Sequence, residues 1–372
     1  MGPMTLHPFF LLLALVGIVT GLHKLNSIFP LSMPIIFAVS TVGLLARLLM
    51  LRGERRKQVS ADAAVDFQRL HAGEVLICAP GIKREMRGHD AAVDQVLTRI
   101  QRGLRLAGPG RSLGSFLLAG PTGTGKTFMA QLVAKTIYPE EEPVLLRMNQ
   151  YKDHADVFTL LGPPPGHPGF EVGGALTRPV LESPYRVVIF DEIDKAHPDV
   201  RHCLYDILDT GLCREKSSGK TVHFGATVFF ATCNAGVEAL RPIWADSSDP
   251  LTRTGRAREA LARCGFEKPF LARFDEILFL DTLPPVTIAE VACLQIARHW
   301  RQFGIEVDYA SPEILVEAVR RNVEFSDYGV RQVARLIQEM TTPSIEAARR
   351  DGYRKVRLEL DAATQRISAA GC

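Results

Sequence analysis

Eight consecutive residues have the types and the spacing that bind nucleotide phosphates. They match the pattern G-x-x-x-x-G-K-[ST] directly after the apolar run 116–119, and they are Gly120, Pro121, Thr122, Gly123, Thr124, Gly125, Lys126 and Thr127. Glycines let the backbone turn tightly, so that its N–H groups point at anionic oxygens. The Lys126 ammonium can reach the β- and γ-phosphates, and the Thr127 hydroxyl can ligate Mg²⁺. The pattern predicts binding of ATP with Mg²⁺; a plain glycine-rich turn between a strand and a helix is the alternative.

A second set of chemically active residues follows downstream. The apolar run 187–190 is typical of a strand buried on both faces, and it ends in Asp191 and Glu192. Ligands of open parallel sheets bind at the carboxyl ends of strands, where these two acids would lie. Asp191 is placed to hold Mg²⁺ through its water shell, and Glu192 to polarise a water for attack on the γ-phosphate. An acidic pair that caps the next helix is the alternative, and the phosphate-binding pattern upstream argues against it.

Composition and charge narrow the class of protein. With 372 residues and 47% hydrophobic content, the chain can form two or three packed domains. Lys and Arg number 44 against 41 Asp and Glu, a balance too even to make nucleic acid the main partner. The seven cysteines are scattered and form no C-x-x-C pair, which favours a reducing compartment and argues against a zinc site or a disulfide framework.

The N-terminal region differs from the rest of the chain. Residues 8–22 and 28–46 are apolar and nearly uncharged, which predicts a membrane hairpin, with the first segment either spanning or re-entrant. The basic residues that follow put the remainder in the cytoplasm by the positive-inside rule, and they are Arg47, Arg52, Arg55, Arg56 and Lys57. A signal peptide would need a basic start, which residues 1–7 lack, and a small-residue cleavage site, which we do not find after residue 22. A buried soluble hairpin would show polar residues at helical spacing, and these segments show almost none.

Several elements are expected to position the phosphate-binding residues. Helices are predicted over residues 91–104 and 126–136, the second directing its N-terminal dipole at the phosphates. A smaller C-terminal domain is expected from about residue 284. There Thr287 and Glu290 form a capping-box pattern, Pro312 starts a further helix, and residues 356–360 alternate as a half-buried strand does.

Longer stretches of the sequence resemble the second ATPase module of the Clp unfoldases. The resemblance runs from about residue 84 to 361 and rests on LGSFLLAGPTGTGKT (113–127), LLGPPPGHPGFEVGGALT (160–177), PYRVVIFDEIDKAHPDV (184–200), GKTVHFGATVFFATCNAG (219–236) and FEKPFLARFDEILFL (266–280). It implies an α/β fold, the AAA+ P-loop NTPase αβα sandwich with a mostly helical lid, here preceded by the membrane hairpin. The expected domains are an anchor (1–51), a juxtamembrane linker (52–80), a large ATPase domain (81–282) and a lid (283–372).

The resemblance also implies roles for three further residues. Asn234 matches the first sensor, whose amide orients the attacking water; without the motif it would be read as a turn former. Arg273 matches the arginine finger, which completes the site of a neighbouring subunit, and a structurally paired arginine is the alternative. Arg331 matches the second sensor, and an ordinary helix-surface arginine is the alternative. An arginine supplied from a neighbour implies a ring, expected to be hexameric.

Two stretches of the sequence depart from the family pattern. The family's channel-lining loop carries an aromatic and an aliphatic residue between glycines and grips extended polypeptide, whereas this chain has His167 and Pro168, followed by Phe170 after Gly169. Proline stiffens this loop, which puts strong pulling in question. Residues 86–89 read Met-Arg-Gly-His where the family has two aliphatics, Gly and Gln, and Arg87 is expected to point to solvent.

The sequence leads to two hypotheses on function. The first is a membrane-anchored AAA+ ATPase of Clp type at the cytoplasmic face of a bacterial inner membrane, which unfolds, threads or remodels a protein substrate. The second is a nucleotide-dependent assembly or switch component of a secretion or conjugation complex that threads nothing, which His167 and Pro168 favour. Both predict ATP hydrolysis and partners that comprise further copies of the chain, a protein and the lipid bilayer, without nucleic acid.

Overall fold

The computed structural model describes residues 74–106, 111–167, 169–246, 249–324, 329–361 and 366–372. The chain divides into the units 1–63 and 64–372, and every described residue belongs to the second. The predicted anchor (1–51, with its apolar segments 8–22 and 28–46) and residues 52–73 of the predicted linker lie outside the described residues. Among the helices that are described, none is both long and apolar enough to cross a bilayer.

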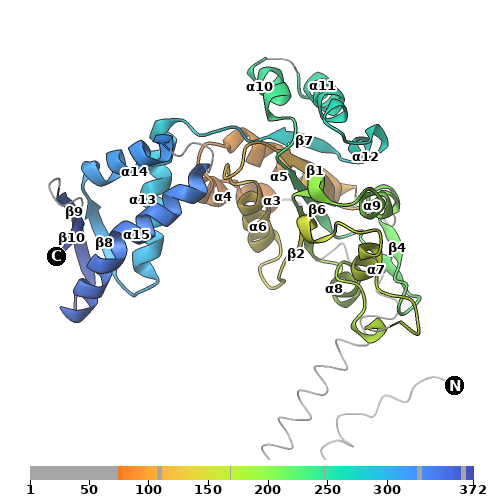
Figure 1. Ribbon diagram of the computed structural model, residues 1–372, viewed down its shortest axis with the longest axis horizontal. Helices are drawn as coiled ribbons and strands as arrows, with labels where there is room; N and C mark the ends of the chain where they lie inside the picture. The colour runs from red at the N-terminus through yellow and green to blue at the C-terminus, as the bar shows by residue number, and fades with distance from the viewer. Residues whose placement is uncertain (1–73, 107–110, 168, 247–248, 325–328, 362–365) are drawn as a thin grey trace, which may run out of the picture. The chain divides into compact units, whose positions relative to one another are not determined.

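A five-stranded parallel sheet forms the centre of the ATPase region, and Figure 1 shows it between two layers of helices. Its strand order is β2-β3-β6-β1-β7. The strands are β1 (Gly114–Ala119), β2 (Val144–Arg147), β3 (Val187–Asp191), β6 (Val228–Cys233) and β7 (Glu276–Phe279). Ala119 pairs with Cys233 and Phe190 with Ala231, so the carboxyl ends of β1, β6 and β3 lie at one edge of the sheet.

Helices cover both faces because successive residues of a buried strand point to opposite sides. In β3, Val187 and Ile189 belong to one apolar cluster, and Val188 and Phe190 belong to the other. The first cluster is covered by α3 (Glu74–Ile77), α4 (Ala79–Glu85), α5 (Asp90–Arg105) and α6 (Lys126–Ile137). The second is covered by α7 (Asp156–Leu161), α8 (Thr177–Glu182), α9 (Pro198–Thr210), α10 (Val237–Ala245), α11 (Pro250–Arg263) and α12 (Lys268–Ala272). This arrangement is the mixed α/β sandwich expected from the sequence.

Short elements complete the ATPase region. Among the described residues of this region, 3₁₀ turns connect longer elements at η2 (Met148–Gln150), η3 (Phe170–Val172) and η4 (Ile193–Lys195). A two-stranded antiparallel hairpin consists of β4 (Leu212–Arg214) and β5 (Thr221–His223).

The ATPase core begins earlier in the chain than the expected boundary at residue 81, which falls inside α4. Val75 of α3 is buried in the same apolar cluster as Ile82 of α4 and Val93 of α5. These helices pack on the sheet because each offers an apolar face, so residues 74–80 are part of the core and not of a linker. Helix α5 lies within one residue of its expected range at each end.

The C-terminal residues have an apolar core of their own. It lies between helices α13 (Pro285–Arg301), α14 (Pro312–Glu324) and α15 (Gly329–Arg350) and the sheet β8 (Glu306–Ala310), β9 (Lys355–Asp361) and β10 (Arg366–Gly371). The expected start of α14 at Pro312 agrees with the structure. The expected capping box is wrong, because α13 begins at Pro285 with Pro284 at its N-cap, which puts Thr287 inside the helix.

Candidate functional site

The phosphate-binding loop joins β1 to α6 and can be formed only with glycine at particular positions. Gly120, Gly123 and Gly125 have φ values of 150°, 80° and 95°, which side chains rarely allow. A Cβ atom on Gly120 would lie 2.1 Å from the Leu280 carbonyl oxygen. Gly125 is the left-handed N-cap of α6, so the helix begins at Lys126 with its free N–H groups at the loop. The loop therefore has the shape of an anion cradle.

Lys126 and Thr124 make contacts within this loop. The Lys126 ammonium is buried and donates to the carbonyl oxygens of Gly120 and Pro121, both at 2.7 Å. The Thr124 hydroxyl donates to the same Pro121 carbonyl at 3.0 Å. The lysine charge thus lies inside the cradle, where it can neutralise phosphate oxygens.

A chain of hydrogen bonds links the loop to the two acids at the end of β3. The Thr127 hydroxyl donates to Asp191 Oδ1 at 2.6 Å, and the Thr232 hydroxyl donates to the same oxygen at 2.8 Å. Thr232 Oγ1 in turn accepts the backbone N–H of Glu192 at 2.9 Å. A hydroxyl and a carboxylate oxygen side by side are donors of the kind that Mg²⁺ prefers, so Thr127 and Asp191 fit this ion. When bound, Mg²⁺ would neutralise charge on the phosphates.

Glu192 has a strained backbone. Its φ of 58° is the one positive value among the described residues other than glycine, and such strain is found at functional sites. Its Oε2 accepts from the Asn149 side-chain amide at 3.3 Å. Glu192 is thus held at the carboxyl edge of the sheet, where its carboxylate can take a proton from an attacking water.

Asn149 is a residue that the sequence reasoning missed. It lies in the turn η2 directly after β2, which pairs with β3, so the two strand ends place it beside Glu192. The signal available from the sequence was a polar residue following a short apolar strand. That signal is weak without the knowledge that β2 neighbours β3.

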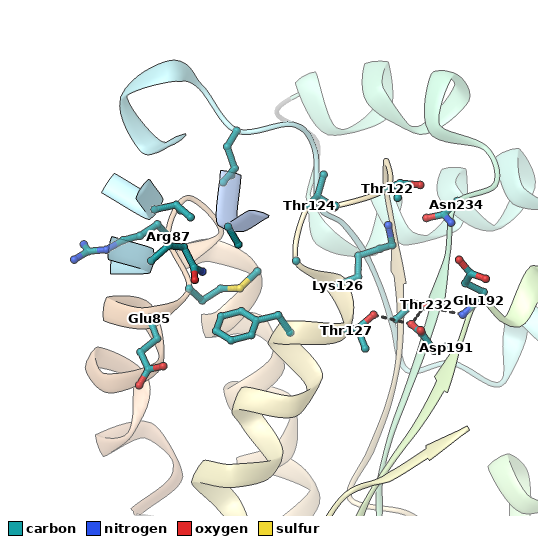
Figure 2. A pocket seen from close by; sticks show the side chains of 18 of the residues that line it. Glu85, Arg87, Thr122, Thr124, Lys126, Thr127, Asp191, Glu192, Thr232 and Asn234 are labelled. Atoms are coloured by element: carbon teal, nitrogen blue, oxygen red, sulfur yellow. Dashed lines mark hydrogen bonds between the residues drawn. The ribbon is translucent and has the colours of Figure 1, made fainter. Parts of the chain in front are cut away.

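Most of the predicted nucleotide-binding residues line one cavity of about 260 Å³, which Figure 2 shows from close by; Gly120 and Pro121 are not among its lining residues. Lys126, Thr127, Asp191, Glu192 and Asn234 lie together on one side of it, and Glu85 and Arg87 lie on the other. The C-terminal domain also contributes to the wall, through Leu283, Val291, Gln295, Arg298 and Ala334. A nucleotide in this cavity would touch both domains.

Two ion pairs join the domains beside this cavity. Arg298 of α13 donates to Glu85 Oε2 at 2.9 Å, and its guanidinium lies 5.6 Å from the centre of the Phe128 ring. Arg87 also lines the cavity, and its Nε lies 3.8 Å from Glu290 Oε2. Its side chain is 37% exposed, so the expectation that Arg87 points to solvent agrees in part with the structure. The glutamate expected to cap α13 is therefore the partner of this arginine.

His89 contacts the back of the phosphate-binding loop. Its side chain is buried and its Nε2 lies 3.1 Å from the carbonyl oxygen of Thr124. Burial lowers the pKa of His89 below its ordinary value, although the hydrogen bond to Thr124 and the carboxylates of Asp281 and Asp90 oppose this effect. A neutral imidazole with hydrogen on Nε2 would donate to that carbonyl.

Of the two arginines implied by the resemblance, the described one, Arg273, is not among the residues that line the cavity. Arg273 lies at the end of α12, where it pairs with Asp209 of α9 at 2.7 Å. Arg331 lies in α15, the helix that also carries Ala334, and its side chain is outside the described part of the chain. Their predicted roles stay predictions.

The loop 166–173 is exposed and glycine-rich. The His167 ring lies 6.2 Å from that of Phe158, and Phe170 and Val172 are 39% and 66% exposed. Pro168 is outside the described residues. Arg178 anchors the turn η3 by donating to the carbonyl oxygen of Val172 at 2.5 Å. The loop thus presents apolar side chains to its surroundings.

The fold and the cavity define a P-loop nucleoside triphosphatase, with a parallel sheet carrying the phosphate-binding loop and two acids. Comparison with known proteins agrees. Residues 111–277 match the family model described as "AAA domain (Cdc48 subfamily)".

Individual relatives are chaperones and a protease subunit of the Clp group. The chain is 33% identical to "Chaperone protein ClpB 1" of Thermosynechococcus vestitus over 282 residues, 73% of this chain and 32% of the relative. It is 32% identical to "ATP-dependent Clp protease ATP-binding subunit ClpE" of Lactococcus lactis over 289 residues, 75% of this chain and 38% of the relative. The chain therefore spans about a third of the length of these curated relatives. These findings support the prediction of a Clp-type AAA+ ATPase with ATP hydrolase activity.

Proposed function

We propose that the chain is a membrane-anchored AAA+ ATPase of Clp type that couples ATP hydrolysis to the unfolding, threading or remodelling of a protein substrate. The observation that carries the proposal is the cavity in which Lys126, Thr127, Asp191, Glu192 and Asn234 meet. Their arrangement supplies a cradle for phosphates, ligands for Mg²⁺ and a base for water. The names of the relatives, chaperone and protease subunit, support a protein as the substrate.

The catalytic cycle follows from these residues. Lys126 and the N-terminus of α6 would hold the triphosphate, and Thr127 with Asp191 would hold Mg²⁺, which would supply positive charge to the phosphates. Glu192 takes a proton from the water that attacks the γ-phosphate, with Asn234 orienting that water. Arg273 of a neighbouring copy stabilises the transition-state charge, so that copies assembled as a hexameric ring build each site jointly.

The two domains around the cavity convert hydrolysis into motion. Because residues of both line the cavity, loss of the γ-phosphate changes what holds them together. Arg331, as the second sensor, carries that change into the lid. The apolar segments 8–22 and 28–46 hold this motion at the cytoplasmic face of a bacterial inner membrane.

A trapping experiment tests the proposal. The variant Glu192→Gln should bind ATP without hydrolysing it, so that a full-length ring in detergent keeps hold of a polypeptide client, detected by crosslinking. Glu259→Gln, an exposed acid of α11 outside both the cavity and the loop 166–173, is the matched control. If the trap captures no polypeptide while the unchanged protein hydrolyses ATP, unfolding is the wrong function.

The second candidate is a nucleotide-dependent assembly or switch component of a membrane secretion or conjugation complex. It is favoured by His167 and Pro168, which stand where a gripping aromatic and an aliphatic residue are expected. The variant His167→Ala separates the two candidates. If His167→Ala loses substrate turnover while ATP hydrolysis stays intact, the result argues against a switch. If His167→Ala still assembles with the partner complex in the same nucleotide-dependent way, the result argues for a switch.

A further inference from the structure

The surroundings of Arg273 are unusually ordered for an arginine at a helix end. Its Nη2 lies 2.7 Å from Asp209 Oδ2, and its guanidinium carbon lies 4.2 Å from the centre of the Tyr205 ring. Its Nε donates to the Tyr205 carbonyl at 3.3 Å, and its Nη1 donates to the Pro269 carbonyl at 2.5 Å. Four groups from three residues therefore fix the plane and the direction of one cation.

The helix α9 is built to make these contacts. Tyr205 and Asp209 are four residues apart, so they lie one above the other on the same face of the helix. The Tyr205 ring stacks on Phe270 of α12 at 5.8 Å, and Phe270 is fully buried in the core. The aromatic platform under Arg273 is thus anchored to the same helix that ends at this arginine.

The contacts of Arg273 are strong enough to orient its guanidinium but weak enough to be replaced by a contact with phosphate. The side chain of Arg273 is 20% exposed and that of Asp209 is 47% exposed, so solvent weakens their ion pair. The interaction of a cation with an aromatic ring is also only modestly stabilising. Charge-assisted hydrogen bonds to a phosphate are stronger, so the guanidinium can still turn to a phosphate that approaches it. An arginine ordered in advance loses less freedom when it meets its target.

Tyr205 and Asp209, like Arg273, are absent from the residues that line the chain's own nucleotide cavity. An effect of these two residues on ATP turnover through Arg273 is therefore expected at the cavity of another copy. We propose that Tyr205 and Asp209 are positioning residues that hold Arg273 ready for the nucleotide site of a neighbouring copy. This inference rests on the proposed role of Arg273 in a joint site.

Single variants give the first test, in full-length protein in detergent. Arg273→Ala should lower kcat by about 10³-fold. Tyr205→Leu and Asp209→Asn should each lower kcat on the order of tenfold, with KM for ATP changed less than twofold. Tyr205→Phe keeps the aromatic face and should restore turnover. Asp206→Asn, an exposed acid on the same helix, is the matched control and should hydrolyse ATP at the unaltered rate.

Mixed assemblies give the sharper test, because they separate the copy that donates the arginine from the copy that hydrolyses. Glu192→Gln copies cannot hydrolyse ATP but carry an intact Arg273 with its two partners. Added to Arg273→Ala copies, or to the double variant Tyr205→Leu/Asp209→Asn, they should raise ATP turnover by complementing the neighbour. Lys126→Ala copies mixed with Glu192→Gln copies should stay inactive, since each copy has a defect in its own nucleotide site that a neighbour's Arg273 cannot repair.

The outcomes distinguish this inference from the function on which it rests. If Arg273→Ala hydrolyses ATP at the unaltered rate, or is not complemented in mixed assemblies, the jointly built site is wrong and the positioning role falls with it. If Arg273→Ala is slow and is complemented, but the double variant is fast or is not complemented, only the positioning role is overturned. If both Arg273→Ala and the double variant are slow and both are complemented, the positioning role of Tyr205 and Asp209 is supported.

Discussion

The nucleotide cavity and the loop 166–173 are built in opposite ways. In the cavity, Lys126 is buried, and Asp191 accepts hydrogen bonds from two hydroxyl groups. In the loop, Phe170 and Val172 are exposed. Glycines mark both regions, but a Cβ atom on Gly120 would collide with the backbone, whereas one on Gly166 would meet nothing within 4 Å.

The two regions need different things from the rest of the protein. Phosphate chemistry requires groups held in one geometry, and in the cavity Lys126 and Asp191 are fixed by hydrogen bonds. A surface that meets a partner requires accessible apolar area and little internal packing. The cavity is therefore sensitive to small changes, and the loop should be sensitive only when its partner is present.

The largest effect is expected from Glu192→Gln. Removing the base should lower kcat for ATP by about 10² to 10⁴-fold, because general base catalysis is worth that much. Nucleotide affinity should stay within threefold, as measured by titration with a fluorescent nucleotide alongside phosphate release. Glu171→Gln in the loop should hydrolyse ATP at the unaltered rate. Equal effects of the two variants would contradict the division between cavity and loop.

Two glycine variants sharpen the comparison further. Gly120→Ala must push the Leu280 carbonyl away, so we expect loss of ATP binding and a fall in the free energy of unfolding of about 3 kcal/mol or more. Gly166→Ala should lower the free energy of unfolding by about 1–2 kcal/mol at most, because backbone strain at its φ of 90° is its main cost. Calorimetric ATP titration and urea unfolding measure both. A severe loss of ATP binding in Gly166→Ala would mean that the loop is part of the nucleotide site.

The double variant Phe170→Ala/Val172→Ala addresses the loop directly. ATP hydrolysis without substrate should change less than twofold, because neither residue lines the cavity. Crosslinking of a polypeptide to the Glu192→Gln trap should fall severalfold once these changes are added to it, because exposed apolar area is lost. Val286→Ala, at an even more exposed apolar position of α13, is the control. If capture of the polypeptide is undiminished, the loop does not contact the substrate.

The smallest effect is a dependence on pH that arises at His89. Its folded-state pKa lies below the ordinary value of 6.5, so the unfolded chain takes up a proton first as the pH falls. The contribution of the neutral, buried imidazole to stability is therefore retained above pH 6.5. It is lost progressively as the pH falls from 6.5 toward the folded-state pKa, because protonation then favours the unfolded chain.

The variant His89→Gln checks this dependence. Between pH 7.5 and 5.5 the urea midpoint should fall further in the unaltered protein than in His89→Gln, which keeps a donor for the Thr124 carbonyl but does not titrate there. His167→Gln, at an exposed position, should keep the full difference. Identical pH responses of the unaltered protein and His89→Gln would show that burial of His89 has no such consequence.

The parts of the site that the sequence predicted are those encoded by local spacing. The loop from Gly120 to Thr127 and the acids after β3 are contiguous patterns, and the parallel sheet follows from their apolar runs. The parts it missed depend on distant residues meeting. Asn149 lies 43 positions from Glu192, and Arg87 meets Glu290 of another domain. Glu290 was assigned to a cap because a local pattern fitted, while Pro285 in fact started the helix.

The most direct test of the account measures ATP turnover per chain against protein concentration in detergent, with assembly followed by sedimentation. Copies that build each site jointly should turn over faster per chain as they assemble, and Arg273→Ala should stay slow throughout. A turnover per chain that does not change across the assembly range, or no hydrolysis at any concentration, would contradict the account.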